Sequence, residues 1–316
     1  MSNLLEGKSA VITGGGGLIG KEICLALAQE GVKVVVNDFG KISSGIGSNK
    51  LPADEVVDEI KRTGGIAVAN YDSVADFFAA ERIIKNCIEE YGKIDILVNC
   101  ATGGAPRNPV FWETTKEEWD IGIGINLNGT FNTCRHALAF MVKQNSGRII
   151  NFASPAWLGL APTWQGGAAP SAYYAGKGGV VSLTRGLAVQ LELDGYKITC
   201  NAIAPIAGPH KHREDLGVFN EGWNKIYNAG LMARPAYDET MNPAGPEHTA
   251  SFVLYLATEA AAKINGYVFG TSRGRVALYS DPSEIKGLYT KGVWSLDELV
   301  KCMPSTLALD LKRARG

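Results

Sequence analysis

The chain has 316 residues, and its 31 Lys and Arg residues nearly balance its 32 Asp and Glu residues, which gives a formal net charge of −1. A hydrophobic content of 46% can support a large buried core, which excludes an intrinsically disordered chain. The balanced charge, without any block of like charges, provides no electrostatic footprint for nucleic acid or for an anionic membrane surface, so we expect neither as a partner.

Signals for secretion, membrane insertion or metal binding are weak. No apolar run approaches the roughly 18 residues of a membrane span, and the first residues, MSNLLEGK, lack the apolar region of a secretory signal. The six cysteines form no CxxC pair, and the four histidines are scattered except for His210 and His212. We therefore expect a soluble, cytoplasmic protein with reduced thiols and without a metal site.

Short β-branched runs alternate with longer amphipathic stretches along most of the chain, which is the pattern of repeated strand–helix units. The runs predict strands over 10–12, 34–36, 66–69, 94–98, 148–152 and 198–203, and the stretches predict helices over 18–30, 52–63, 74–91, 116–142 and 172–193. Because the strands are continuous apolar runs, both of their faces should be buried. The sequence thus predicts a single-domain α/β fold of the Rossmann type, with a doubly wound, mostly parallel sheet and helices on both faces.

Two long irregular segments interrupt this alternation, over 39–51 and 206–245. In a doubly wound sheet, the loops at the carboxyl ends of the strands border the ligand crevice, so long loops there often serve function. The second segment combines glycine and proline residues with large apolar ones, which predicts a lid that closes over a substrate. The alternative for both segments is a surface loop without a role.

The chain continues for more than forty residues after the last apolar run, near 267–269. We expect residues 1–270 to form the ligand-binding domain and residues 271–316 to form an extension that packs on this domain or on a neighbouring subunit. Ser295 and Glu298 have the spacing of a capping box, which predicts a short helix within the extension.

A glycine-rich stretch from Thr13 to Gly20 lies between the first predicted strand and the first predicted helix. Its Gly15-x-Gly17-x-x-Gly20 spacing allows a tight turn and lets backbone N–H groups approach a pyrophosphate at the positive end of the helix. Asp38 ends the second predicted strand, about twenty residues later. A carboxylate there binds ribose hydroxyls and repels a 2′-phosphate, so the two features together predict NAD rather than NADP as the cofactor. The alternative is a glycine turn that binds nothing.

Tyr173 and Lys177 are four residues apart at the start of a predicted helix, which places them on the same helix face. A neighbouring ammonium group stabilises a phenolate, so Tyr173 could act as an acid or a base near neutral pH. Ser154 follows the strand predicted over 148–152, and its hydroxyl could hold a substrate oxygen. Taken alone, a Tyr–Lys pair is more often a surface pair, and a serine after a strand is more often a helix cap.

Residues 5–270 resemble the short-chain dehydrogenase/reductase family, because several motifs occur in the order that is typical of it. These motifs are the glycine turn, Asp72, Asn99-Cys-Ala101, Asn126-Leu-Asn-Gly129, Ser154, Tyr173 with Lys177, and Ala204-Pro205. The resemblance implies cofactor contacts from Gly14, Gly17, Leu18, Ile19, Gly20, Asp38, Asp72, Ser73, Asn99, Ala101, Tyr173, Lys177 and Pro205.

The same resemblance implies a catalytic tetrad of Asn126, Ser154, Tyr173 and Lys177. In this tetrad Ser154 would polarise the substrate carbonyl and Tyr173 would exchange the proton. Lys177 would hold the ribose and lower the pKa of Tyr173, and Asn126 would support a water relay. Hydride would pass between the substrate and the nicotinamide.

Within the family the chain is similar to the 3-hydroxyacyl-CoA dehydrogenase unit of the peroxisomal multifunctional enzymes of type 2. The segments that carry this similarity are 34–40, 52–60, 64–74 and 203–208, with the long loop after the second strand. It implies NAD and an acyl thioester substrate. The chain departs from the family at Leu18 and Thr102, where glycines are usual. The segment 155–172 is several residues longer than is usual, and 209–245 lacks the usual threonine after the proline.

These observations favour an NAD-dependent oxidoreductase that interconverts a secondary alcohol and a ketone by hydride transfer, most plainly on a 3-hydroxyacyl-CoA with a bulky apolar acyl group. Lys211 and Arg213 are candidates for contacts with the phosphates of coenzyme A. One alternative is a dehydrogenase of a free alicyclic, aromatic or steroidal secondary alcohol, and another is a non-catalytic subunit of a heteromeric dehydrogenase.

The helix predicted over 172–193 carries apolar residues on more than one face, so another subunit could cover one of them. The family resemblance implies a homodimer or a homotetramer that is built on this helix and on the one before it.

Overall fold

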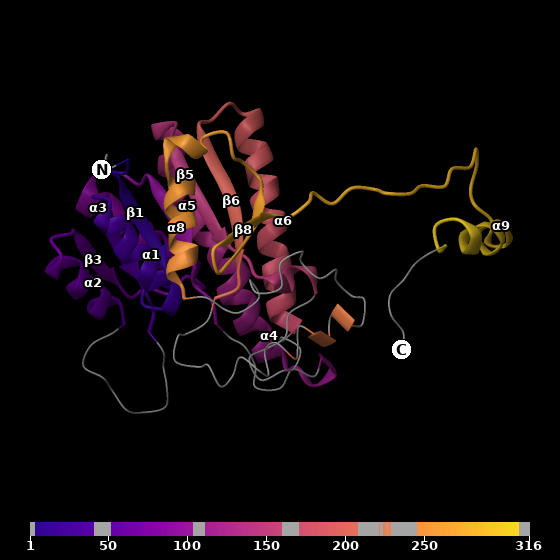
Figure 1. The fold of residues 1–316 in the computed structure, drawn as a ribbon, viewed down its shortest axis with the longest axis horizontal. Helices are drawn as coiled ribbons and strands as arrows, with labels where there is room; N and C mark the ends of the chain where they lie inside the picture. Colours follow the sequence, from indigo (N-terminus) through magenta and orange to yellow (C-terminus); the bar gives the residue numbers. More distant parts are fainter. Residues whose placement is uncertain are drawn as a thin grey trace.

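The computed structural model describes residues 4–40, 52–103, 111–159, 171–207, 221, 224–225, 227–228 and 245–309. Within this part of the chain, eight strands form one sheet in the order β3-β2-β1-β4-β5-β6-β7-β8 (Figure 1). Neighbouring strands are parallel from β3 through β7, and β8 is antiparallel to β7. The predicted fold class, a doubly wound and mostly parallel sheet, is confirmed.

Helices cover both faces of this sheet. The strands are β1 (Ser9–Thr13), β2 (Lys33–Asn37), β3 (Ala67–Asn70), β4 (Ile96–Asn99), β5 (Gly147–Phe152), β6 (Ile198–Pro205), β7 (Val268–Ser272) and β8 (Arg275–Leu278). The main helices are α1 (Leu18–Gln29), α2 (Pro52–Arg62), α3 (Phe77–Tyr91), α4 (Lys116–Ile123), α5 (Gly129–Gln144), α6 (Ser171–Leu193), α8 (Glu247–Ala257) and α9 (Leu296–Cys302). Helices α1, α2 and α8 pack on one face, and α3, α5 and α6 pack on the other (Figure 1).

Alternate residues of each strand supply the two cores. In β1, Ile12 packs into the core beneath α1, α2 and α8, whereas Val11 packs into the core beneath α3, α5 and α6. Successive side chains of a strand point to opposite faces, so a strand that is covered on both sides needs apolar residues at consecutive positions. This requirement explains why the strands could be read from continuous apolar runs.

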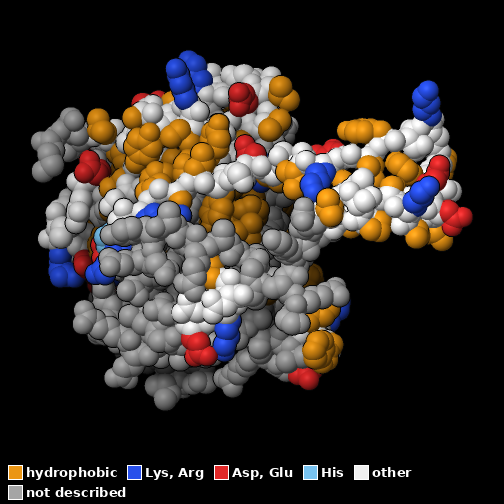
Figure 2. Space-filling view, turned by 45° about the vertical axis from the view of Figure 1, so that its right-hand side comes forward, with side chains coloured by type: hydrophobic (Ala, Val, Ile, Leu, Met, Phe, Trp, Pro, Cys, Tyr) orange, Lys and Arg blue, Asp and Glu red, His pale blue; other side chains and the backbone are white. Residues whose placement is uncertain are grey.

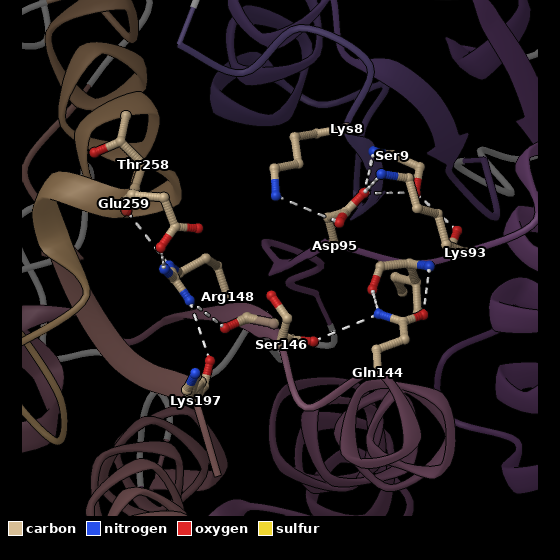
Figure 3. A network of polar contacts seen from close by, with 12 residues as sticks. Lys8, Ser9, Lys93, Asp95, Gln144, Ser146, Arg148, Lys197, Thr258 and Glu259 are labelled. Carbon is tan, nitrogen blue, oxygen red and sulfur yellow. Dashed lines mark hydrogen bonds and ion pairs between the residues drawn. The ribbon is translucent and has the colours of Figure 1, made fainter.

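Ion pairs fix the edge of the sheet where the parallel strands begin. Asp95, just before β4, pairs with Lys93 at 2.9 Å and accepts a hydrogen bond of 2.9 Å from the backbone N–H of Ser9. Arg148, a buried residue of β5, pairs with Glu259 at 2.9 Å (Figure 3). The opposite edge, where the strands end, is the one that binds ligands in sheets of this type.

Several features of the chain were not predicted from the sequence, and helix α8 is one of them. The helix expected over 116–142 is divided into α4, a π-helical turn η2 (Gly124–Asn128) and α5. Strand β8 folds back on β7 and extends the sheet into the segment 271–316. The lid predicted over 206–245, and most of the loop predicted over 39–51, lie outside the described residues.

Beyond β8 the chain leads away from the body of the molecule and ends in α9, which stands apart from it (Figure 1). We call residues 280–309 the C-terminal arm. The predicted capping box is confirmed at the start of α9, because Ser295 Oγ accepts from the N–H of Glu298 at 3.3 Å and the Glu298 carboxylate accepts from the N–H of Ser295 at 2.8 Å.

Among the helices in the described part of the chain, none combines the length and the apolar character that crossing a membrane requires.

Candidate active site

The glycine turn between β1 and α1 forms a tight cradle at the ligand edge of the sheet. Gly14 has a φ of +66°, and a Cβ there would lie 2.8 Å from Cα of Ala101. A Cβ at Gly20 would collide with the carbonyl oxygen of Gly14. Gly17 caps α1 and has no side chain that could accept from the N–H groups of the first helical turn, which includes Leu18 and Ile19. The turn therefore fits the pyrophosphate of a dinucleotide.

Asp38 lies directly beside this turn, one residue beyond β2. Its carboxylate accepts hydrogen bonds from the backbone N–H groups of Gly16 at 3.0 Å and Gly40 at 2.9 Å. The carboxylate is thus held against the cradle, at the position from which ribose hydroxyls are bound in dinucleotide sites. The residues present fit an adenine dinucleotide.

The residues after β3 and β4 that were expected to contact the cofactor differ in what their side chains bind. Asp72 is ion-paired with Arg82, and Ser73 Oγ accepts a hydrogen bond from a nearby backbone N–H at 3.3 Å. Asn99 is buried, and its amide nitrogen donates to Asn151 Oδ1 at 2.9 Å. The side chain of Asn99 therefore belongs to the interior of the sheet, and only its backbone is available at the ligand edge.

Asn126 lies in the π-helical turn η2, a local widening of the helix that often occurs at functional sites. Its side chain is 1% exposed. The amide nitrogen donates to the carbonyl oxygens of Gly103 and Gly122, each at 2.9 Å, and Oδ1 accepts from the hydroxyl of Thr102 at 2.9 Å. Every hydrogen of the Asn126 amide is therefore used within the protein.

Two glycines of α6 let η2 approach that helix closely. A Cβ at Gly176 would lie 3.1 Å from Cβ of Asn126, and a Cβ at Gly179 would lie 2.8 Å from Cδ2 of Leu127. Because no side chain separates the two helices at these points, Asn126 is brought next to the predicted acid–base pair of α6.

Tyr173 and Lys177 share one face of α6, as the spacing predicted. Nζ of Lys177 lies 5.6 Å from the centre of the Tyr173 ring. The lysine is 2% exposed and donates to the carbonyl oxygen of Phe152 at 2.7 Å. Burial lowers the pKa of Lys177 to about 8, because the charged form is poorly solvated there. Lys177 is thus buried and Tyr173 is half-buried, which excludes the alternative of an exposed surface pair.

Burial also acts on Tyr173, and it raises the pKa of the phenol above its usual value. Hydrogen bonds with Ser154 and Thr102 work in the other direction and lower that pKa. Burial is the largest of these influences, so it outweighs the lowering of the Tyr173 pKa that the Tyr–Lys pairing led us to expect.

Ser154 caps the short turn η3 (Pro155–Leu158) and also lies near Tyr173. It follows β5, and its Oγ accepts from the N–H of Ala156 at 3.3 Å at the start of this turn. Ser154 also lowers the pKa of the Tyr173 phenol, so the two side chains lie near each other at the ligand edge. Pro205 ends β6 at this same edge.

Thr102 is the residue of this site that sequence reasoning missed. It was noted only as a departure from the family, although it follows β4 at the ligand edge, bonds to Asn126 and lowers the pKa of Tyr173. The predicted substrate-side residues His210, Lys211, His212 and Arg213 lie outside the described residues. In the described ranges, no group of three or more His, Cys, Asp or Glu side chains is arranged to hold a metal ion.

Comparisons with known proteins by sequence and by structure both find similarity to short chain dehydrogenases. A family model described as short chain dehydrogenase matches residues 8–209. The crystal structure of a short chain dehydrogenase from Mycobacterium avium superimposes with a TM-score of 0.75 at 31% identity, covering 99% of this chain and 97% of that one.

Two curated relatives differ in how much of their length the chain covers. The peroxisomal multifunctional enzyme type 2 of Mus musculus is 34% identical over 85% of this chain, but the match covers 32% of that enzyme. A hydroxy(phenyl)methylsuccinyl-CoA dehydrogenase subunit of Thauera aromatica is 30% identical over 86% of this chain and 97% of the subunit. The chain thus spans about a quarter to a third of the length of its first peroxisomal relatives.

Proposed function

The chain belongs to the short-chain dehydrogenase family, and we propose that within this family of oxidoreductases it is an NAD-dependent enzyme that interconverts a secondary alcohol and a ketone, with a 3-hydroxyacyl-CoA carrying a bulky apolar acyl group as its substrate. The observation that carries the proposal is the convergence of Tyr173, Lys177 and Ser154 at the edge of the sheet where the glycine turn and Asp38 also lie.

The proposed mechanism assigns each side chain a separate task. The cofactor, when bound, accepts or supplies the hydride. The hydroxyls of Ser154 and Tyr173 hold the substrate oxygen, and Tyr173 removes the alcohol proton as the hydride leaves the carbon, or returns it in the reverse direction. The ammonium of Lys177 favours the phenolate form of Tyr173 and is a donor for ribose hydroxyls. Asn126 lies in the turn that packs closely against α6 at Gly176 and Gly179, on the helix that carries both residues.

The choice of NAD over NADP rests on Asp38. Its carboxylate is anchored by two backbone N–H groups beside the glycine turn. There it can accept hydrogen bonds from the ribose of NAD, and it repels the 2′-phosphate of NADP.

Two observations support an acyl-CoA substrate. The Thauera aromatica relative is named for an acyl-CoA that bears a phenyl group, and the chain covers almost all of that subunit. The similarity to the dehydrogenase unit of the peroxisomal enzymes extends over 85% of the chain. The Tyr–Lys pair is intact, with Lys177 buried and Tyr173 half-buried, which counts against a purely non-catalytic subunit.

We also propose that the protein is a homodimer or homotetramer in which α5, α6 and the C-terminal arm contact a second copy. On α6, Val189 and Leu193 are 58% and 82% exposed. The arm leaves the body beside the same helix, where Arg185 pairs with Asp281 at 3.1 Å. Exposed apolar side chains continue along the arm (Figure 2), namely Ile285, Tyr289, Val293, Leu296 and Val300.

An arm of this kind needs a surface to pack on. Helix α9 has 7 residues, whereas isolated helices shorter than about 12 residues are marginal in water even when they are capped. Val293 is 97% exposed, so the free arm would hold apolar side chains in water. If two copies exchanged their arms, the apolar side chains of both arms would be buried together. A specific protein–protein interface buries about 800 Å² per partner, and the arms would contribute to that area.

The experiment that tests the proposed reaction is a screen of 3-hydroxyacyl-CoA esters with aliphatic and aromatic acyl groups against free secondary alcohols, each with NAD and with NADP. Turnover should appear with the thioesters and NAD, and kcat/KM should be at least tenfold lower with NADP. Turnover of the free alcohols but not of the thioesters would show that the substrate is a free secondary alcohol and not an acyl-CoA. Equal kcat/KM with both cofactors would remove the role given to Asp38.

A further inference from the structure

The proposed mechanism needs the hydroxyl of Ser154 at one fixed point, and the turn η3 determines where that hydroxyl lies. Oγ of Ser154 accepts from the N–H of Ala156 at 3.3 Å, and the carbonyl oxygen of Ser154 accepts from the N–H of Trp157 at 2.9 Å. A hydroxyl oxygen that accepts from an N–H keeps its own hydrogen for donation. Ser154 can therefore donate to a substrate oxygen, but only from the position in which the turn holds it.

The turn η3 is too short to keep this shape by itself. It has four residues, and the N–H of Gly159 closes it by donating to the carbonyl oxygen of Ala156 at 2.8 Å. Short 3₁₀ turns have poor hydrogen-bond geometry, and helical segments of this length depend on tertiary packing. The position of Ser154 thus depends on what the turn packs against.

The side chain of Trp157 anchors the turn to the body of the protein. The rings of Trp157 and Tyr279 meet edge-to-face, with their centres 5.5 Å apart and their planes at 85°. The guanidinium carbon of Arg185 lies 5.8 Å from the centre of the Trp157 ring. Both arrangements are favourable for an indole. The two rings pack on a buried apolar cluster that consists of Ala153, Val180, Val181, Ala202, Ala204 and Val268.

The two residues that contact the indole are held by other elements of the fold. Tyr279 directly follows β8, and its N–H donates to the carbonyl oxygen of Val268 in β7 at 2.9 Å. Arg185 lies on α6 and pairs with Asp281 at 3.1 Å. Through these contacts the turn after β5 is tied to β7, to β8 and to the helix that carries the proposed acid–base pair.

Ring contacts, and not a hydrogen bond of the indole, hold Trp157 in place. Its Nε1 is buried, and within the described ranges this N–H has no acceptor. Replacement of Trp157 by Phe would therefore break no hydrogen bond there and would keep an aromatic ring in the contact. Replacement by Leu would remove the ring.

We propose that Trp157 and Tyr279 are positioning residues, whose ring contact fixes the turn η3 and, through it, the hydroxyl of Ser154 that holds the substrate oxygen. Both residues act through Ser154 and have no contact with the reacting atoms. Tyr279 lies in the segment 271–316, so the end of β8 serves as a support of the site. This inference rests on the role that the proposed function gives to Ser154.

The test removes the ring of Tyr279 and compares Tyr279→Leu with Tyr279→Phe, which keeps the ring, and with Tyr255→Leu as the control. Tyr255 stacks on Phe252 at 5.9 Å within α8, the helix on the opposite face of the sheet, so its replacement removes a similar ring contact far from η3. Trp157→Leu breaks the proposed contact from the other side and should behave like Tyr279→Leu. It keeps the test decisive if Tyr279→Leu does not fold.

The first readout needs neither cofactor nor substrate. It is the hydrogen exchange of the amides of Ala156, Trp157 and Gly159, whose N–H groups are hydrogen-bonded within the turn. Loss of an aromatic contact should open the turn more often, so these amides should exchange about two- to tenfold faster in Tyr279→Leu. Tyr279→Phe and Tyr255→Leu should keep the exchange rates of the parent protein.

The second readout is steady-state kinetics, in the parent protein and in a Ser154→Ala background. Tyr279→Leu should lower kcat by about tenfold because Ser154 is misplaced, and NADH affinity should not change because the glycine turn belongs to other elements. In Ser154→Ala, where the hydroxyl is already absent, Tyr279→Leu should lower kcat no further. A merely structural role would lower kcat by the same factor in both backgrounds.

Unchanged amide exchange in Tyr279→Leu would overturn the inference, as would an unchanged kcat or an equal loss of kcat in both backgrounds. The two readouts separate this inference from the proposed function. Faster exchange of the turn in a protein that turns over no alcohol would retain the anchored turn and reject the reaction. Normal turnover with unchanged exchange would do the reverse.

Discussion

At the scale of single residues, the main feature of the site is the ammonium group of Lys177, which is buried and therefore poorly hydrated. Lys177 is enclosed at the ligand edge, and its ammonium donates to the carbonyl oxygen of Phe152 at 2.7 Å. Burial lowers its pKa from the usual value to about 8. The charged lysine thus lowers the free energy of unfolding while serving the proposed reaction, and such destabilising groups are common in active sites.

Replacement of Lys177 by Met should therefore stabilise the protein and abolish turnover. Below pH 8 the folded state holds a charged lysine against its lowered pKa, which costs on the order of 3 kcal/mol. Above pH 8 the folded lysine loses its proton before the unfolded one does, so this penalty declines as pH rises toward the unfolded pKa. Thermal unfolding should show the largest gain for Lys177→Met at pH 7 and a smaller gain at pH 10.

The exposed Lys263 provides the control for this prediction, because Lys263→Met removes a lysine without relieving any burial. A gain in stability for Lys177→Met that does not change between pH 7 and pH 10 would show that packing, and not the charge, is responsible.

Sequence reasoning at this scale identified the Tyr–Lys pair from its spacing along one helix, and Asp38 from its place at the end of the strand that follows the glycine turn and α1. The cofactor contact expected of Asn99 stays a prediction, and the structure leaves only the backbone of Asn99 available for it. Its side chain bonds Asn151, its neighbour across β4 and β5, and such a partner is set by strand register. Thr102 was missed for a related reason, since its hydrogen-bond partner Asn126 lies on η2, a separate element.

At the scale of elements, strands were predictable where both of their faces are covered, and helices where an amphipathic pattern marks one buried face. The π-helical turn η2 was not, because the amphipathic pattern of 116–142 runs through it without a break. What favours the turn is packing, since Gly176 and Gly179 of α6 admit it at close range. Strand β8 was missed because its residues alternate between half-buried and exposed positions and form no apolar run.

The contact between η2 and α6 can be tested by adding a single methyl group. Gly176→Ala should lower kcat several-fold, because the new Cβ would lie 3.1 Å from Cβ of Asn126 and has to displace it. Gly186→Ala makes the same change on the same helix where nothing lies within 4 Å. The control should gain about 0.5–1 kcal/mol of stability from helix propensity and keep its activity.

Thermal unfolding and steady-state kinetics of the two variants provide the comparison. Equal activity in both would mean that the position of Asn126 is not set by this contact.

At the scale of the whole molecule, the arm is the feature that a single chain leaves unexplained. It carries exposed apolar side chains from Ile285 to Val300 and stands away from the body (Figures 1 and 2). From the sequence, the extension was expected to pack on the domain or on a neighbouring subunit. The assembly that we propose would supply the neighbouring surface.

Removal of residues 280–316 should therefore weaken self-association and leave the fold of the body intact, since the sheet ends at β8. Light scattering at micromolar concentration should give at least a dimer for the full chain and a smaller species, or a concentration-dependent mixture, for the shortened one. Circular dichroism would serve as the check that the body remains folded. A full chain that is monomeric at this concentration would refute the proposed assembly.

The central claim is that Tyr173 is the acid–base group of a dehydrogenase site, and the most direct measurement removes only its hydroxyl. Tyr173→Phe should retain NADH binding, measured by the fluorescence of NADH, and should lose turnover by roughly 100- to 10,000-fold. Tyr174→Phe is the matched control, because adjacent helical residues point about 100° apart, and it should keep both properties. Turnover in Tyr173→Phe close to that of the parent protein, with NADH bound, would contradict the account.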